Sequence, residues 1–173
     1  MYYLINFTLL GLIYFLVFYK KWSKKTKTVL IINTLMYVYI SIVLYVTLMP
    51  FTFPLGGSNN LFMRSANFIP FKDLRLNRAG SVKEIILNVV MMVPFGFLYP
   101  ITKTKGIIKT VIITFIFSLA IECSQLLSVW WGGFASRTFD VTDLITNTTG
   151  GFIGYLIFII LKPFVSIVLK ENN

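Results

Sequence analysis

The side chains best suited to chemistry in this sequence lie where a lipid bilayer would exclude them. Glu122 is ionisable and sits inside an apolar stretch, where Ser118, Gln125 and Ser128 recur with it at helical spacing and form one polar stripe. An ionisable side chain at such a depth costs about 3 kcal/mol on insertion scales, so it indicates a role or a partner. Glu122 is a candidate ligand contact or general base, and the alternative is interhelical hydrogen bonding that only holds helices together.

A second set of polar residues opens the last apolar stretch. Asp140 has the position and residue type of a helix N-cap, and Asp143 in the first turn is favoured by the helix dipole. Asp143 and Asn147 share one helix face, which continues as Gly150 and Gly154, a spacing typical of close helix contacts. Asp143 is therefore a second candidate general base, and all three polar residues are candidate ligand contacts.

A third helix is predicted to place a polar residue at the same depth in the membrane. Counted from the predicted outer boundary, Asn88, Glu122 and Asn147 each lie about seven or eight residues into their helices, which is roughly 10 to 12 Å. We therefore expect a shared polar cavity that opens to the outer side and is also lined by Gln125. Arg137, in the short connection above it, is predicted to neutralise a carboxylate or to bind an anionic ligand bidentately.

The absence of histidine narrows the possible chemistry. It excludes Ser-His dyads, HExxH zinc sites and most transition-metal sites. No nucleophile is identifiable, and Glu122, Asp143 and Asn147 do not follow a recognisable metal-binding spacing, so we expect no cofactor and no metal. The net charge of +10 does not indicate a nucleic-acid partner, because the basic residues lie between apolar stretches rather than in a binding motif.

Long apolar helices must position these side chains. Hydrophobic residues make up 57% of the chain and charged residues 13%. Runs of about 18 to 22 apolar residues are long enough to cross a hydrocarbon core of roughly 30 Å. Pro94 predicts a kink and a freed carbonyl at Val90, and Pro100 and Pro163 are expected to close the third and fifth spans. The predicted fold class is an all-α membrane protein, a single domain over residues 1–173 with spans at about 2–19, 29–49, 84–101, 107–130 and 141–161.

Basic residues predict how the helices are oriented. With the N-terminus outside and the C-terminus in the cytoplasm, ten lysines and arginines are cytoplasmic and six are outside, as the positive-inside rule favours. Five of the six outer cations lie in the connection between spans two and three: Arg64, Lys72, Arg75, Arg78 and Lys83. The same connection contains the apolar motif from Asn67 through Pro70 to Phe71. We expect an outward-facing interfacial segment whose rings are buried while its cations meet lipid phosphates; the alternative is a solvated loop.

Four short motifs give the sequence a family resemblance. They are Asn67–Phe71 (NFIPF), Asn88–Gly96 (NVVMMVPFG), Glu122–Gln125 (ECSQ) and Arg137–Gly150 (RTFDVTDLITNTTG). In this order they resemble the VanZ family of bacterial membrane proteins, although the pair Trp130 and Trp131 is more aromatic than the family pattern. The resemblance implies a bacterial cytoplasmic membrane protein linked to resistance against teicoplanin, a glycopeptide antibiotic with a lipid tail that binds cell-wall precursors.

Three functional hypotheses follow. In the first, the cavity and the basic segment bind an anionic lipid head group, a lipid-linked cell-wall precursor or the acyl tail of the antibiotic. In the second, the protein is a membrane enzyme in which Glu122 or Asp143 is the general base and Arg137 stabilises developing negative charge. In the third, the polar groups only fix the register of helices in an assembly scaffold.

Overall fold

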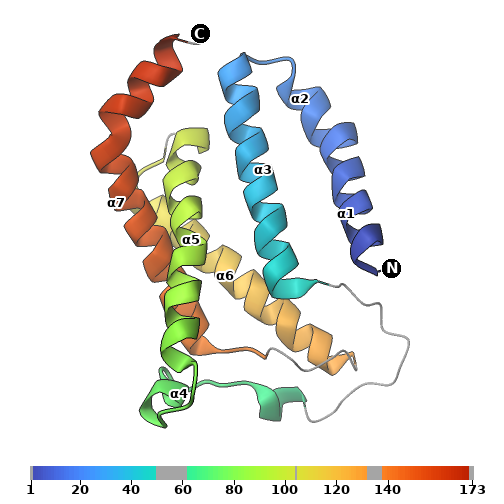
Figure 1. Cartoon of the computed structure of the whole chain (residues 1–173), viewed down its shortest axis with the longest axis vertical. Helices are drawn as coiled ribbons and strands as arrows, with labels where there is room; N and C mark the ends of the chain where they lie inside the picture. Colours follow the sequence, from blue (N-terminus) through green and yellow to red (C-terminus); the bar gives the residue numbers. More distant parts are fainter. Residues whose placement is uncertain (1, 50–61, 104, 132–137, 172–173) are drawn as a thin grey trace.

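Five long helices form the structure, which is a computed structural model that describes residues 2–49, 62–103, 105–131 and 138–171. The first long helix is built from three consecutive pieces, and each of the other four is a single helix (Figure 1). All five are long and apolar enough to cross a membrane, which confirms the predicted number of spans. Their bounds are α1 Tyr2–Ile13, the π-helical turn Tyr14–Tyr19, α2 Lys20–Trp22, α3 Lys27–Leu48, α5 Ser81–Lys103, α6 Ile107–Trp130 and α7 Val141–Glu171.

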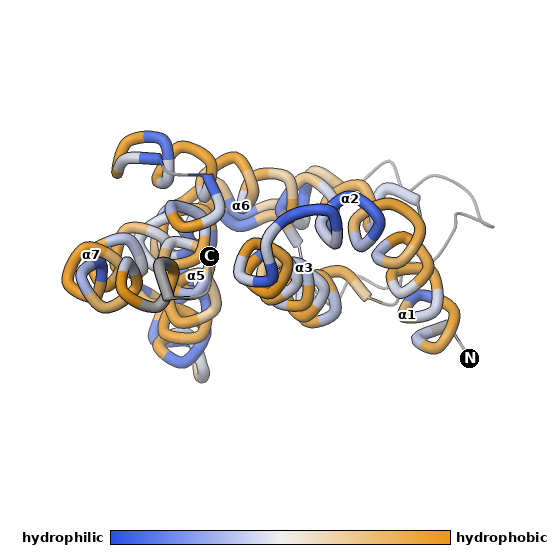
Figure 2. The backbone as a smooth tube through the Cα atoms, turned by 90° about the horizontal axis from the view of Figure 1, so that it is seen from above, coloured by the Kyte–Doolittle hydropathy of each residue, from blue (hydrophilic) through white to orange (hydrophobic). Residues whose placement is uncertain are grey.

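The helices are arranged as a row with one oblique neighbour. Seen from above, α1, α3, α5 and α7 follow one another, and α6 lies along one side of this row (Figure 2). In the side view α6 crosses the others at a slant and contacts α3, α5 and α7 (Figure 1). The central core is made by Val43 of α3, Met92 and Phe95 of α5, and Ile121 of α6. Apolar side chains facing away from it are widely exposed, as expected for helices surrounded by lipid.

Glycine residues bring the backbones of α5 and α7 into direct contact. A Cβ atom at Gly150 would overlap the carbonyl oxygen of Val89, and one at Gly154 would overlap that of Val93. A Cβ atom at Gly151, the next residue of α7, would overlap the side chain of Thr114 in α6. The small-residue spacing in α7 therefore packs one helix against two neighbours, as predicted for close helix contacts.

Prolines do not end the helices as expected from the sequence. Pro100 lies inside α5, which continues to Lys103, and Pro163 lies inside α7, which continues to Glu171. α5 thus ends close to the predicted limit of the third span near Ile101, whereas α7 continues well past the predicted limit near Leu161, because a helix in a membrane protein tolerates the missing N–H of a proline when other groups compensate. Close to Pro94, the Tyr39 hydroxyl of α3 donates to the carbonyl oxygen of Met91 at 2.7 Å, next to the Val90 carbonyl that the proline frees.

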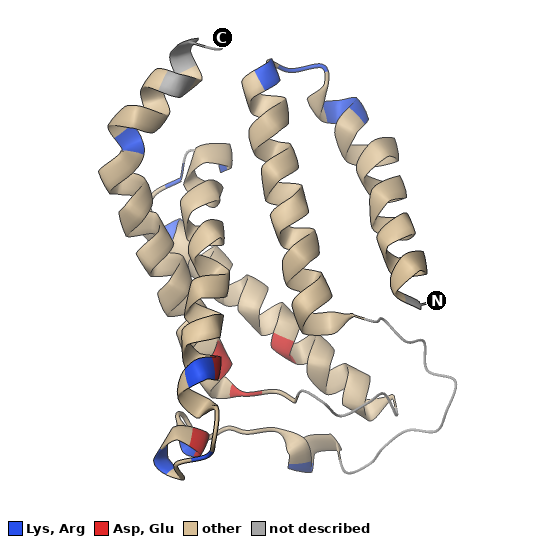
Figure 3. Cartoon of the chain, in the orientation of Figure 1, with Lys and Arg blue, Asp and Glu red and all other residues tan. Residues whose placement is uncertain are grey.

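The connection between α3 and α5 lies at the end of the bundle where α7 begins (Figure 1). Its described part contains the 3-10 turn Phe62–Ser65 and the short helix α4, Lys72–Arg75. Apart from Glu171 at the far end of α7, the acidic residues that the structure describes lie toward this end, together with the cations of the connection (Figure 3). Lysines also gather at the opposite end, between α2 and α3 and between α5 and α6. The first part of the connection, residues 50–61, lies outside the described residues.

Candidate functional site

The NFIPF motif is attached to the start of α7 through Asn67. The backbone N–H of Asn67 donates to the carbonyl oxygen of Phe139 at 2.8 Å, and the Val141 N–H donates to the carbonyl oxygen of Asn67 at 3.0 Å. These two bonds form a parallel bridge between Asn67 and Asp140. The Asn67 side-chain amide adds a third link, donating to Oδ2 of Asp140 at 2.9 Å. Two predicted site residues that are distant in sequence are thus brought into direct contact.

Asp140 caps α7 and is also tied to α6. Its Oδ1 accepts the Thr142 N–H at 2.6 Å, which confirms the N-cap interpretation. Its own backbone N–H donates to Oε2 of Glu122 at 2.9 Å. Glu122 is only 2% exposed, so its carboxylate accepts a backbone donor in a region without bulk water. Glu122, Asp140 and Asn67 therefore form a continuous polar connection from α6 through the α7 cap to the interfacial segment.

The predicted polar stripe of α6 faces the interior of the bundle for most of its length. Ser118, Glu122 and Gln125 are buried, whereas Ser128 is exposed. The Gln125 amide donates to the carbonyl oxygen of Thr47 in α3 at 3.1 Å. This bond satisfies a backbone carbonyl near the end of α3 and is consistent with an interhelical holding role for Gln125.

Asn147 pairs with α6 through Ser118 rather than through Glu122. Its amide nitrogen donates to the Ser118 hydroxyl at 2.9 Å, one helical turn along α6 from Glu122. Asn147 is 1% exposed, and its Oδ1 atom has no hydrogen-bond partner among the described residues. The expectation that Asn88, Glu122 and Asn147 lie at one depth of the membrane stays a prediction. Asn88 of α5 is half-buried and joins none of these hydrogen bonds.

The motif ends in a residue with an unusual backbone conformation. Phe71, which follows Pro70, has φ 55° and ψ 30°, the left-handed region that bulky residues seldom occupy. Its N–H donates to the Thr142 hydroxyl at 3.0 Å, so the first turn of α7 holds it in place. Strained residues of this kind persist where surrounding contacts fix them, and they concentrate at functional sites. The turn sets the direction in which α4 leaves the bundle.

The cations of the interfacial segment are exposed. Lys72 and Arg75 of α4 point into the surroundings, and Arg78 forms an ion pair with Asp73 at 3.0 Å. Apolar side chains of the same segment are also exposed, among them Phe68, Ile69, Leu74 and Leu76. This mixture agrees with a segment in the head-group layer, where apolar side chains meet acyl chains and cations meet phosphates.

Two further predicted site residues are Arg137 and Asp143. Arg137 lies outside the described residues, so its predicted contact with Glu122 or Asp143 stays a prediction. Asp143 is half-buried in the first turn of α7, next to the cap. Within the described parts of the chain, no group of three His, Cys, Asp or Glu side chains is placed to hold a metal ion.

A known protein family and one of its members match the part of the chain that contains this site. The family described as VanZ/LLP1 matches residues 36–162, which include every residue of the site. The chain belongs to the VanZ/LLP1 family. It is 30% identical over 125 residues to Protein VanZ of Enterococcus faecium, covering 72% of this chain and 71% of that relative. No solved structure matches. The VanZ/LLP1 match begins within α3, so α1 and the first part of α3 lie outside it.

Some members of the network were not predicted from sequence. Thr142 accepts the Phe71 N–H, Thr47 accepts the Gln125 amide, and Asp73 pairs with Arg78. For Asp73, the arginines nearby in the sequence could have indicated an ion pair. For Thr142 and Thr47 the contacts join segments far apart in the VanZ/LLP1 chain, and no local pattern indicates them.

Proposed function

We propose that this membrane protein lowers the susceptibility of a bacterial cell to lipoglycopeptide antibiotics such as teicoplanin. In this proposal, the interfacial segment binds an anionic lipid, a lipid-linked cell-wall precursor or the drug's acyl tail at the outer surface of the cytoplasmic membrane. The polar network of Glu122, Asp140 and Asn67 holds that segment in position. Membership of the VanZ/LLP1 family and the likeness to Protein VanZ support the link to resistance.

The observation that carries the proposal is the combination of exposed cations and exposed apolar side chains on one fixed segment. Lys72 and Arg75 of α4 are exposed together with Leu74 of the same helix and Leu76, which follows it. Lipid phosphates and acyl chains offer complementary groups at the same depth of the membrane. A surface that holds such lipids near the cell-wall precursor would reduce the antibiotic's access to it.

The network supports this proposal because it fixes the segment to the bundle. Three hydrogen bonds join Asn67 to the start of α7, and Glu122 adds a fourth from α6. Hydrogen bonds that are shielded from water constrain geometry more strongly than exposed ones. We infer that the polar residues of α6 and α7 act mainly by positioning, while the cations make the contacts with the ligand.

Antibiotic susceptibility of a sensitive Gram-positive host tests the proposal. The host expresses the wild type, Glu122→Gln, Arg137→Ala, Asn147→Ala or the double variant Lys72→Gln/Arg75→Gln, and membrane levels are checked by immunoblot. The matched control is Lys24→Gln/Lys25→Gln, which removes two exposed cations from the opposite end of the bundle. Teicoplanin and vancomycin are compared, since only the first carries an acyl tail.

The double variant in α4 is expected to lose teicoplanin protection at normal expression, while the control double variant keeps it. Selective loss in Glu122→Gln would show that the network is needed as well, and selective loss in Asn147→Ala would show that its pair with Ser118 is needed. If the α4 double variant and its control protect equally well, the interfacial segment is not the functional surface and the proposal is wrong.

A further inference from the structure

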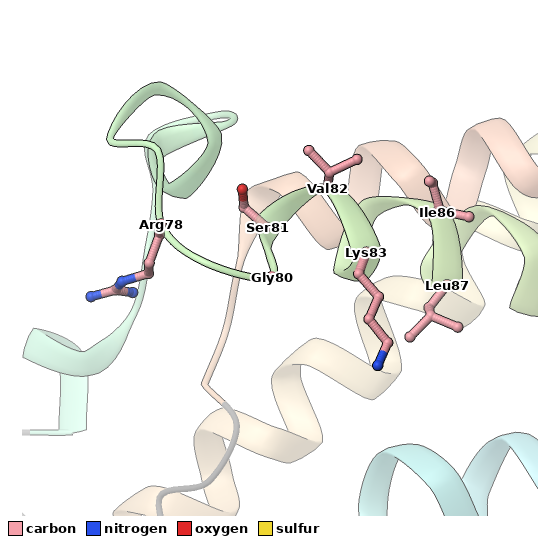
Figure 4. Close-up of a pocket in the computed structure, with 7 residues that line it drawn as sticks. All are labelled: Arg78, Gly80, Ser81, Val82, Lys83, Ile86 and Leu87. Atoms are coloured by element: carbon pink, nitrogen blue, oxygen red, sulfur yellow. The ribbon is translucent and has the colours of Figure 1, made fainter.

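A groove at the start of α5 lies beside the interfacial segment. Its volume is about 480 Å³, within the range typical of ligand sites. The residues that line it include Arg78, Gly80, Val82, Lys83, Ile86 and Leu87 (Figure 4). Val82 and Ile86 lie on one edge of α5 and Lys83 and Leu87 on the other, while Arg78 and Gly80 are at the head (Figure 4). We call this surface the α5 groove.

The α5 groove is polar at its head and apolar along its length. Lys83 is exposed, and the Arg78 side chain is 70% exposed. Farther along the helix, Ile86 and Leu87 are both more than half exposed. The groove begins at the first turn of a candidate membrane span, so its head lies at the level of the lipid head groups and its body at the level of the acyl chains.

The charge at the head of the α5 groove indicates which kind of lipid the groove would bind. Arg78 contacts Asp73 through Nη1 only, which leaves its other N–H donors for a ligand but neutralises its charge. Lys83 then contributes one uncompensated positive charge, and no acidic side chain lines the groove. A phosphodiester with a single negative charge matches this head, whereas a diphosphate would remain under-neutralised.

We infer that the α5 groove binds one anionic glycerophospholipid of the phosphatidylglycerol class. Its phosphate lies between Arg78 and Lys83, and one acyl chain runs along Ile86 and Leu87. The inference rests on the proposed function, because it names the lipid class that the outer end of the bundle holds. A zwitterionic lipid fits less well, since its ammonium group would face the Lys83 ammonium.

Native mass spectrometry of the purified full-length protein tests this inference. The protein is equilibrated with equal amounts of phosphatidylglycerol and phosphatidylcholine of the same acyl chains, and the bound lipids are counted. Two variants change the groove: Lys83→Gln removes its charge, and Ile86→Trp fills its apolar body. Matched controls are Lys105→Gln, an exposed lysine at the opposite end, and Ile112→Trp, a half-exposed apolar residue of α6.

The wild type is expected to retain phosphatidylglycerol over phosphatidylcholine, and Lys83→Gln to bind it about fivefold more weakly, as expected for one surface cation acting on an anionic lipid. Ile86→Trp should also lose the lipid, and both controls should keep it. Equal retention of the two lipids, or equal losses in Lys83→Gln and Lys105→Gln, would overturn the inference.

A further arm adds a polyprenyl diphosphate at equal concentration. If it displaces phosphatidylglycerol in a Lys83-dependent manner, the assignment to a singly charged phospholipid is wrong. The antibiotic assay remains separate from this one. If the protein binds phosphatidylglycerol in the groove but gives no protection against teicoplanin, the inference holds and the proposed function is wrong.

Discussion

Asn67 and Asp140, which are 73 positions apart in the sequence, are joined through both backbone and side chain. The side-chain bond links an amide to a carboxylate that also caps α7, so one aspartate serves the helix and the interfacial segment together. Asn67 Oδ1 in turn accepts the Ile69 N–H at 3.1 Å and shapes the start of the NFIPF turn. The pair is therefore the main mechanical link between the membrane bundle and the segment on its surface.

Replacing Asn67 should loosen that link without unfolding the bundle. Asn67→Ala removes the hydrogen bonds to Asp140 and Ile69, and we expect a loss of about 1 to 3 kcal/mol in the stability of the attached segment. Hydrogen–deuterium exchange should accelerate in residues 62–80 and remain unchanged in α5 and α7. Asn33→Ala is the control, because the Asn33 amide bonds only to Val29 within its own helix. Unchanged exchange in residues 62–80 would show that the backbone bridge alone holds the segment.

A single methyl group on the α7 glycine face should destabilise the bundle. Gly150→Ala places a Cβ against the Val89 carbonyl oxygen, which belongs to the backbone and cannot rotate away. We expect a decrease of about 1 to 3 kcal/mol in the free energy of unfolding, measured by SDS titration in mixed micelles. Gly11→Ala is the control because a Cβ at Gly11 of α1 has no neighbour within 4 Å, and alanine favours a helix. Equal stability of both variants would contradict the close packing of α5 and α7.

The hydroxyl of Tyr39 should contribute to stability through the Met91 carbonyl. Tyr39→Phe keeps the ring and removes the 2.7 Å hydrogen bond next to Pro94. Hydrogen bonds between membrane helices contribute about 0.6 kcal/mol on average and up to about 1.7, so a decrease in this range is expected in the same SDS titration. Tyr45→Phe is the matched variant, since the Tyr45 hydroxyl bonds to none of the described residues and its ring packs against Tyr3 and Phe7. A larger loss in Tyr45→Phe than in Tyr39→Phe would contradict a stabilising role for the hydrogen bond to Met91.

Asn147 and Ser118 should be energetically coupled. Either alanine substitution removes their 2.9 Å hydrogen bond and leaves the other polar group buried without it, whereas the double substitution removes both groups. A double-mutant cycle in the SDS titration should therefore give a coupling free energy of about 0.5 to 1.7 kcal/mol. Strict additivity of the two single effects would show that the bond adds nothing to stability.

The sequence predicts local features of this protein well and long-range ones poorly. The five spans follow from the lengths of the apolar runs, and the Asp140 cap and the Gly150 contact follow from rules that act within one helix. The bridge from Asn67 to Asp140 depends on how distant segments meet, which no local pattern contains. The hydrogen bond between Asn147 and Ser118 likewise depends on how α6 and α7 meet. Pro163 was expected to end a helix that continues to Glu171, since the missing donor alone does not decide where a helix stops.

The glycine contacts between α5 and α7 also constrain how this protein can respond to anything that binds it. Because the two backbones touch at Val89 and Val93, there is no layer of side chains between them that could slide or repack. The α5 groove and the α7 cap are therefore parts of one rigid frame. A ligand in the groove cannot signal by separating these helices. Adjustment falls to the first long helix, which is joined to α3 by bonds such as that from the Tyr37 hydroxyl to the Leu10 carbonyl oxygen and lies outside the matched region of the family.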